Sequence, residues 1–234
     1  MAVTAWRTFN SVTTEIFSDS SGNTSRWNGS NNVDQDIPLV TVLNSLDSPN
    51  VISFTDPNSR RAGASVKVGD RSPYLTLSGL SNLAIPSDAA IVGVELMINR
   101  SAPRMAMDIG GVGMGPFYYT VYGTDLDVRL AVDGVTSSNM SLETNWINPV
   151  DNNGYATRVD YLGSSSSLFG VTITPANAGN LVVTYSATAT LTGASDEIPL
   201  AFLAIDYFAA RYHYTTGGTT PPSTNSNSIT TTIF

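Results

Sequence analysis

Cysteine is absent from this 234-residue chain, and lysine and histidine each occur once, as Lys67 and His213. Without thiols the chain can form neither disulfides nor thiolate metal sites, so its stability must come from packing or from assembly. Nucleophilic catalysis needs a base beside the nucleophile, and only one imidazole is present. The four glutamates of the chain also give little support to a carboxylate-based hydrolase. We therefore predict a protein that is not an enzyme and that holds no cofactor or metal ion.

Charged residues are also scarce. They make up only 13% of the chain, about half the usual share, and the net charge is −8. Nucleic-acid binding needs a basic patch, so no nucleic-acid partner is expected. No stretch approaches the roughly 18 apolar residues of a membrane span, and the N-terminal segment lacks the apolar core of a signal peptide. We expect a protein that is made in a cytoplasm and has no membrane partner.

Apolar and polar residues alternate along several segments, which predicts half-buried antiparallel strands. The pattern is strongest over residues 91–100, 125–132 and 181–192. In the second of these, the side chains of Leu126, Val128, Leu130 and Val132 are expected to point inward. The Asp-Gly pair at 133–134 follows directly and predicts a hairpin, because the tight turn needs positive φ at both residues. Shorter strands are expected at residues 37–43, 51–54, 74–80 and 169–174.

Many short strands separated by Gly- and Pro-containing turns predict an all-β fold. The fold we expect is an antiparallel β-sandwich or jelly roll with extended terminal arms. An N-terminal arm is predicted at residues 1–26, one sandwich domain at 27–214 and a C-terminal extended arm at 215–234. A loop rich in Gly, Met and Tyr is inserted at 101–123. Residues 228–234 could add a strand to a neighbouring sheet or return to their own.

The stretch LAIDYFAARYHY, residues 203–214, is the most aromatic part of the chain. Apolar residues on both of its faces predict a central strand, or a strand covered by a second layer. Asp206 should then accept hydrogen bonds from a backbone turn or an arginine, because an unpaired buried carboxylate is costly. Arg211 and His213 share one face, and the lone histidine near a strand end is expected at the surface or rim.

Two further patterns are candidate sites of chemistry. Asp125 and Asp127 are predicted to point to the same strand face, and paired carboxylates can serve a glycosidase or a metal. Arg129 continues that face, so we favour a solvated or salt-bridged strand. The run GGVGMG at 110–115 lacks the GxGxxG spacing and the strand–turn–helix context of a phosphate-binding loop. A tightly turning loop is expected there.

A series of motifs runs in a fixed order through the predicted domain. The motifs are Trp27-Asn28, Tyr74-Leu75, Ile85-Pro86, AAIVGVELMINR at 89–100, DLDVRL at 125–130, FGVTI at 169–173 and AIDYFAARYHY at 204–214. Their order resembles that of a sandwich domain found in tail and capsid-associated proteins of tailed bacteriophages. The motifs describe a strand order and no active site. The inserted loop and the arm-like ends depart from the pattern, which leaves the part of the virion open.

This resemblance implies a structural virion protein, and above all a capsid decoration (cement) protein. The implied partners are the major capsid protein and copies of the chain itself, in a trimer. The alternative is a tail or fibre subunit, or a tail module that binds host glycans through loop aromatics such as Trp146. A surface poor in Lys and Glu is typical of protein–protein interfaces, although strand propensity alone also favours Thr and Ser. The residues expected at protein interfaces are Tyr118, Tyr119, Ile229, Ile233 and Phe234.

Overall fold

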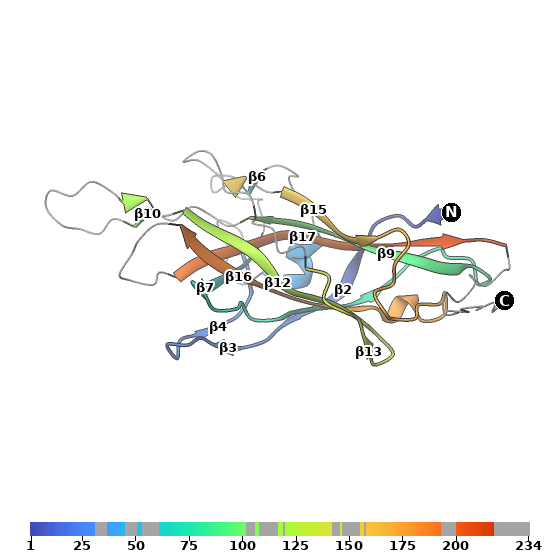
Figure 1. Ribbon diagram of the computed structural model, residues 1–234, viewed down its shortest axis with the longest axis horizontal. Coiled ribbons are helices and arrows are strands. Elements are labelled where there is room, and N and C mark those ends of the chain that lie inside the picture. The colour runs from blue at the N-terminus through green and yellow to red at the C-terminus, as the bar shows by residue number, and fades with distance from the viewer. Residues whose placement is uncertain are drawn as a thin grey trace, which may run out of the picture.

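One large antiparallel sheet dominates the computed structural model, as the sequence alternation predicts (Figure 1). Eleven strands belong to this sheet. The prediction of a mostly β, antiparallel protein is confirmed at this level. The structure describes residues 1–30, 37–44, 51–52, 61–101, 106–107, 117–118, 120–141, 146, 155–156, 158–192 and 200–217.

The strands of the large sheet follow the order β13-β12-β16-β8-β2-β17-β7-β5, while β9 pairs with β17 and β15, and β1 pairs with β17. Their bounds are β1 Ala2–Val3, β2 Arg7–Thr14, β5 Asn28–Ser30, β7 Arg61–Lys67, β8 Leu75–Leu80, β9 Ala90–Ser101, β12 Thr120–Val132, β13 Val135–Thr136, β15 Arg158–Ser164, β16 Val182–Thr192 and β17 Leu200–Thr215. Short pairs are formed by β3 Phe17–Ser18 with β4 Thr24–Ser25, β6 Val51–Ile52 with β14 Tyr155–Ala156, and β10 Ala106–Met107 with β11 Phe117–Tyr118. The helical segments are α1 Leu39–Leu43 and the 3-10 helix η1 Ala178–Asn180.

Strand β2 joins two parts of the large sheet. Its residues 7–8 pair with β17, whereas residues 9–14 pair with β8. Phe9 is fully buried, and its ring centroid lies 6.0 Å from that of Phe208 on β17. Tyr185 on β16 contacts the same phenylalanine, with centroids 5.8 Å apart. Side chains from both parts of the sheet therefore enter one hydrophobic core.

Strands β9 and β17 form a long antiparallel pair along the length of the molecule (Figure 1). Val94, Leu96 and Ile98 of β9 are fully buried, as their alternation predicts. Strand β17 is central, with β9 on one side and β7, β2 and β1 on the other. Its register shifts at Asp206, which is buried and accepts a hydrogen bond from Asn99 Nδ2 at 3.0 Å. The buried carboxylate is thus hydrogen-bonded, as expected, and this donor is an amide of the neighbouring strand.

Strand β12 departs from the predicted alternation. A register shift against β16 between Asp125 and Asp127 indicates a β-bulge, which moves the following side chains to the opposite face. Asp125 is therefore buried, whereas Leu126, which was expected to point inward, is 44% exposed. Asp127 instead accepts a hydrogen bond from Arg129 Nε at 2.7 Å. The prediction that the two aspartates share a face is wrong, and the predicted salt bridge on this strand is confirmed for Asp127 alone.

The predicted strand at residues 37–43 is also wrong, because most of it forms helix α1. The amides of Thr41 and Val42 donate to the carbonyl oxygen of Pro38 and close the first turn. A short apolar run is compatible with either a strand or a buried helical turn. Here the helix buries Val42 and Leu43 in the core, so tertiary packing decides between the two.

Residues 169–174 form a turn and irregular chain instead of the predicted strand. Phe169 has a φ of 53°, which is incompatible with an extended strand at that point. Val171 and Ile173 are nevertheless buried in the core. The alternation therefore identified the buried side chains correctly and the backbone conformation wrongly.

The predicted N-terminal arm, residues 1–26, contains β1 to β4 and enters the large sheet through β1 and β2. Within the predicted insertion at 101–123, β10 pairs with β11. Residues 218–234 of the predicted C-terminal arm lie outside the described residues, so the division into arms and domain stays a prediction. Among the residues that the structure describes, no helix is long and apolar enough to cross a membrane.

Candidate functional site

The residues predicted from sequence to form interfaces are only partly described. Tyr118 lies in β11, where its backbone pairs with that of Ala106. Trp146, expected as an accessible loop aromatic, is instead buried, so its ring is not available to a glycan. The predicted interface residues that lie outside the described part of the chain are Tyr119, Ile229, Ile233 and Phe234.

A different surface cluster is formed on the outer face of the long strand pair. It consists of Trp6, Glu95, Tyr161, Arg211 and His213, and we call it the aromatic–arginine patch. Because side chains alternate along a strand, the residues that follow the buried positions of β9 and β17 point away from the core. Glu95 is the register partner of Arg211 on the neighbouring strand. Tyr161 comes from β15, and Trp6 directly precedes β2.

Glu95 is the centre of the patch. Its Oε2 atom lies 2.7 Å from Arg211 Nε and 2.7 Å from His213 Nε2. Partial burial would raise the pKa of Glu95, but the hydrogen bonds from His213 and Arg211 outweigh it and hold the pKa below its ordinary value. The carboxylate therefore stays ionised at neutral pH and fixes both partners on the outer face.

The Trp6 ring packs against the arginine of this ion pair, and Tyr161 packs against Trp6. The Arg211 guanidinium lies 4.3 Å from the centroid of the Trp6 ring, and the Trp6 and Tyr161 centroids are 5.7 Å apart. Tyr161 remains 55% exposed. A surface combining Trp, Tyr and Arg has the composition of the energetic centres of protein–protein interfaces.

Strand β1 extends the patch with apolar surface. Val3 is the register partner of His213, so the two side chains lie on the same face. Val3 is 46% exposed and Met1 is 77% exposed. The main chain of Thr4 donates to the carbonyl oxygen of Tyr212, which holds β1 against β17. The outer face thus offers exposed apolar side chains beside an ordered ion pair.

A buried ion cluster connects β9, β12, β15 and β16 inside the protein. Arg100 Nη1 lies 2.7 Å from Asp125 Oδ2, and Arg100 Nη2 lies 3.1 Å from Asp160 Oδ2. The first contact is a close ion pair rather than an aligned hydrogen bond. Asp125 Oδ1 accepts hydrogen bonds from the Tyr185 hydroxyl at 2.7 Å and from Trp146 Nε1 at 3.2 Å. All five side chains are buried, so the cluster fixes strands and does not face a ligand.

The environment of this cluster shifts two pKa values. Burial raises the pKa of the Asp125 carboxyl, while the charge of Arg100 and the donors Tyr185 and Trp146 act in the opposite direction. Burial also raises the pKa of the Tyr185 hydroxyl well above its ordinary value. Sequence reasoning missed the cluster, although one signal was present: Arg100 continues the inward-facing positions of its strand, and an inward arginine requires a buried acid.

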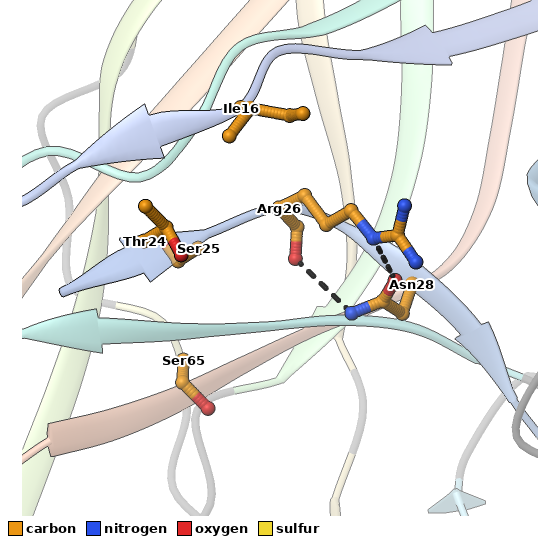
Figure 2. Close-up of a pocket in the computed structure, with 6 residues that line it drawn as sticks. All are labelled: Ile16, Thr24, Ser25, Arg26, Asn28 and Ser65. Atoms are coloured by element: carbon orange, nitrogen blue, oxygen red, sulfur yellow. Dashed lines mark hydrogen bonds between the residues drawn. The ribbon is translucent and has the colours of Figure 1, made fainter.

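An open pocket of about 410 Å³ lies beside the β3–β4 hairpin (Figure 2). This volume is large enough for a small ligand. Among the described residues, its lining combines hydroxyl and amide groups, one guanidinium and one apolar side chain. These lining residues are Ile16, Thr24, Ser25, Arg26, Asn28 and Ser65.

No protein-family model matches the chain, and a comparison with curated proteins finds no match either. Within the described ranges, no group of three or more His, Asp or Glu side chains could hold a metal ion.

Proposed function

We propose that this protein is a structural virion protein of a tailed bacteriophage, acting as a capsid decoration (cement) protein. The ordered sequence motifs support this proposal, and three of them lie largely within strands β9, β12 and β17 of one sheet. The observation that carries the assembly role is the aromatic–arginine patch together with the exposed side chains of Met1 and Val3 beside it. Such a surface gains free energy when a neighbouring subunit covers it.

We also propose that the large sheet is folded over as a β-sandwich. Two observations support this arrangement. Strand β2 divides its pairing between β17 and β8, which allows the chain to turn from one layer to the other. The ring of Tyr185 on β16 packs against Phe208 on β17, although these strands are not hydrogen-bonded neighbours.

In the proposed assembly, the patch contacts copies of the chain in a trimer and the major capsid protein. Covering Met1, Val3 and Tyr161 removes apolar surface from water, at roughly 25 cal/mol per Å². The Glu95–Arg211 pair gives the contact a fixed polar pattern, which favours one orientation of the partner. A modest contact energy is sufficient, because it is repeated over many copies on one shell.

The test compares two matched valine variants of the full chain. Val3→Asp places a charge in the patch, whereas Val135→Asp places the same charge on β13, where the valine is 54% exposed. Size-exclusion chromatography with light scattering should show an oligomer for the parent chain and for Val135→Asp, and a shift toward monomer for Val3→Asp. A monomeric parent chain, or equal behaviour of the two variants, would contradict the assembly role of the patch.

The location and copy number in imaged virions decide between the capsid and the tail. A cement protein should be present in hundreds of copies over the shell. A tail or fibre subunit, the second candidate, could use the same patch but should be present in tens of copies or fewer. Absence from purified virions would refute both versions.

A further inference from the structure

The pocket beside the β3–β4 hairpin has features of a binding site that the assembly role does not use. We propose that it binds an acidic saccharide, with Arg26 holding the carboxylate of the sugar and the surrounding hydroxyl groups of Thr24, Ser25 and Ser65 meeting its hydroxyls. This proposal is independent of the patch, which lies on β9, β15 and β17. It requires a free cationic group, ordered walls and a lining suited to a sugar.

Arg26 provides the cationic group. Its Nε donates to Asn28 Oδ1 at 2.8 Å, which orients the guanidinium, as the dashed line in Figure 2 shows. Its Nη1 and Nη2 have no hydrogen-bond or ion-pair partner among the described residues, and none of the described residues that line the pocket carries a carboxylate. Two parallel N–H donors in a plane match the two oxygens of a carboxylate. The guanidinium is thus held in place while its carboxylate-binding edge stays free.

The hairpin that forms one wall is tied down at its tip. The only lysine of the chain, Lys67, donates from Nζ to Ser20 Oγ at 2.8 Å and to Ser21 Oγ at 2.7 Å. The Ser20 amide donates to Asp70 Oδ2 at 2.9 Å. Asp19 Oδ1 closes the turn by accepting from the amide of Ser21 at 2.8 Å. An ordered wall lowers the entropy lost when a ligand binds.

The base of the hairpin is fixed as well. Trp27 is buried, and its Nε1 donates to the carbonyl oxygen of Pro73 at 2.8 Å. The Arg71 guanidinium lies 4.1 Å from the centroid of the Phe17 ring and forms a two-bond pair with Glu15. The chain on both sides of the pocket is therefore anchored to β7 and to the β7–β8 connection.

The lining favours a sugar over a peptide. Peptide sites offer apolar pockets for side chains or a strand edge for main-chain pairing. Here Thr24, Ser25 and Ser65 offer hydroxyl groups that can both donate and accept, which suits the hydroxyls of a saccharide. Ile16 is 72% exposed at one side of the pocket and provides an apolar surface for the C–H groups of a sugar ring.

The test is an NMR titration of the full-length ¹⁵N-labelled protein with D-galacturonate and tri-galacturonate. Saturable shifts are expected at the amides of residues 24–28 and of Ser65. Arg26→Gln should weaken binding about tenfold or more, because a charge-assisted hydrogen-bond pair is lost. The matched control is Arg129→Gln, which removes an exposed arginine from β12 and should leave the affinity unchanged.

Three further probes separate the possible ligands. D-galactose, acetate and tri-alanine should each bind at least about tenfold more weakly than galacturonate, because each lacks part of the recognised group. Equal binding of galactose would show that the carboxylate is not recognised. Equal binding of acetate would reduce the site to an anion site, and tighter binding of tri-alanine would favour a peptide terminus. Any of these results, or the absence of shifts at residues 24–28, would overturn the proposal.

Discussion

Replacing Arg100 by methionine should destabilise the fold more than any exposed-charge substitution. Arg100 is fully buried and neutralises the buried carboxylates Asp125 and Asp160. Removing one partner of a buried ion pair typically costs about 3–5 kcal/mol, because it leaves an uncompensated buried charge. Asp125 keeps its hydrogen bonds from Tyr185 and Trp146 in this variant. We therefore expect the free energy of unfolding to fall by about 3 kcal/mol, the lower end of that range. In urea this corresponds to a shift of the unfolding midpoint by about 1 M or more.

Two companion variants make the explanation specific. Arg129→Met breaks the pair with Asp127, in which the arginine side chain is 43% exposed, and should cost less than about 1 kcal/mol. The triple variant R100M/D125N/D160N removes the buried charges together. It should recover more than half of the free energy of unfolding that R100M loses. If R100M costs no more than Arg129→Met, the buried cluster does not contribute as argued.

The pH dependence of R100M provides a second readout. Burial raises the pKa of the Asp125 carboxyl, and the variant lacks the cation that opposes this effect. Its folded-state pKa then lies above its unfolded value, so the folded form gains protons first as the pH falls. The difference in the free energy of unfolding between the parent chain and R100M should therefore shrink from about pH 7 to about pH 5. A difference that is constant or grows over this range would refute the reasoning.

Three other perturbations have definite expected outcomes. Glu95→Gln should remove stabilisation that the parent chain has above the ordinary pKa of 4.5 and loses as the pH falls through the lowered pKa. The difference in thermal midpoint between the two proteins should thus be fully present above about pH 6 and shrink as the pH falls below 4.5; a pH-independent difference would argue against the Glu95–Arg211 pair. Gly123→Ala should cost about 1–3 kcal/mol in urea unfolding, because its Cβ would overlap the buried Trp146 ring; an unchanged midpoint would exclude that overlap. Trp27→Phe should lower the thermal midpoint by about 2–4 °C or more, since it leaves a buried carbonyl oxygen without its donor; an equal or higher midpoint would contradict this.

Strand identity was largely predictable, because alternation is a local property of the sequence. The segments at 75–80, 91–100 and 182–192 are strands, and the turn at Asp133-Gly134 has the two positive φ angles, 51° and 84°, that its residues require. These features depend on side-chain period and on backbone sterics at single residues. Neither needs information from a distant part of the chain.

The candidate sites were much less predictable, because each combines side chains from separate segments. The face shared by Arg211 and His213 follows from the sequence, but the positions of Trp6 and Tyr161 beside Arg211 depend on how β2, β15 and β17 come together. The pocket likewise needs the hairpin that follows β2 to lie against β7. Of the pocket residues, Arg26 is the one that the sequence makes noticeable, because the chain has few Lys and Arg residues.

The antiparallel strands, the alternation of side chains along them and the position of a tight hairpin turn thus follow from local sequence. Where the alternation breaks depends instead on tertiary contacts. The bulge that buries Asp125 and exposes Leu126 depends on pairing with β16, and the helix at 39–43 exists because that conformation buries its apolar residues. These outcomes depend on free energies of burial and ion pairing between distant segments, and such contacts exist only once the chain has folded.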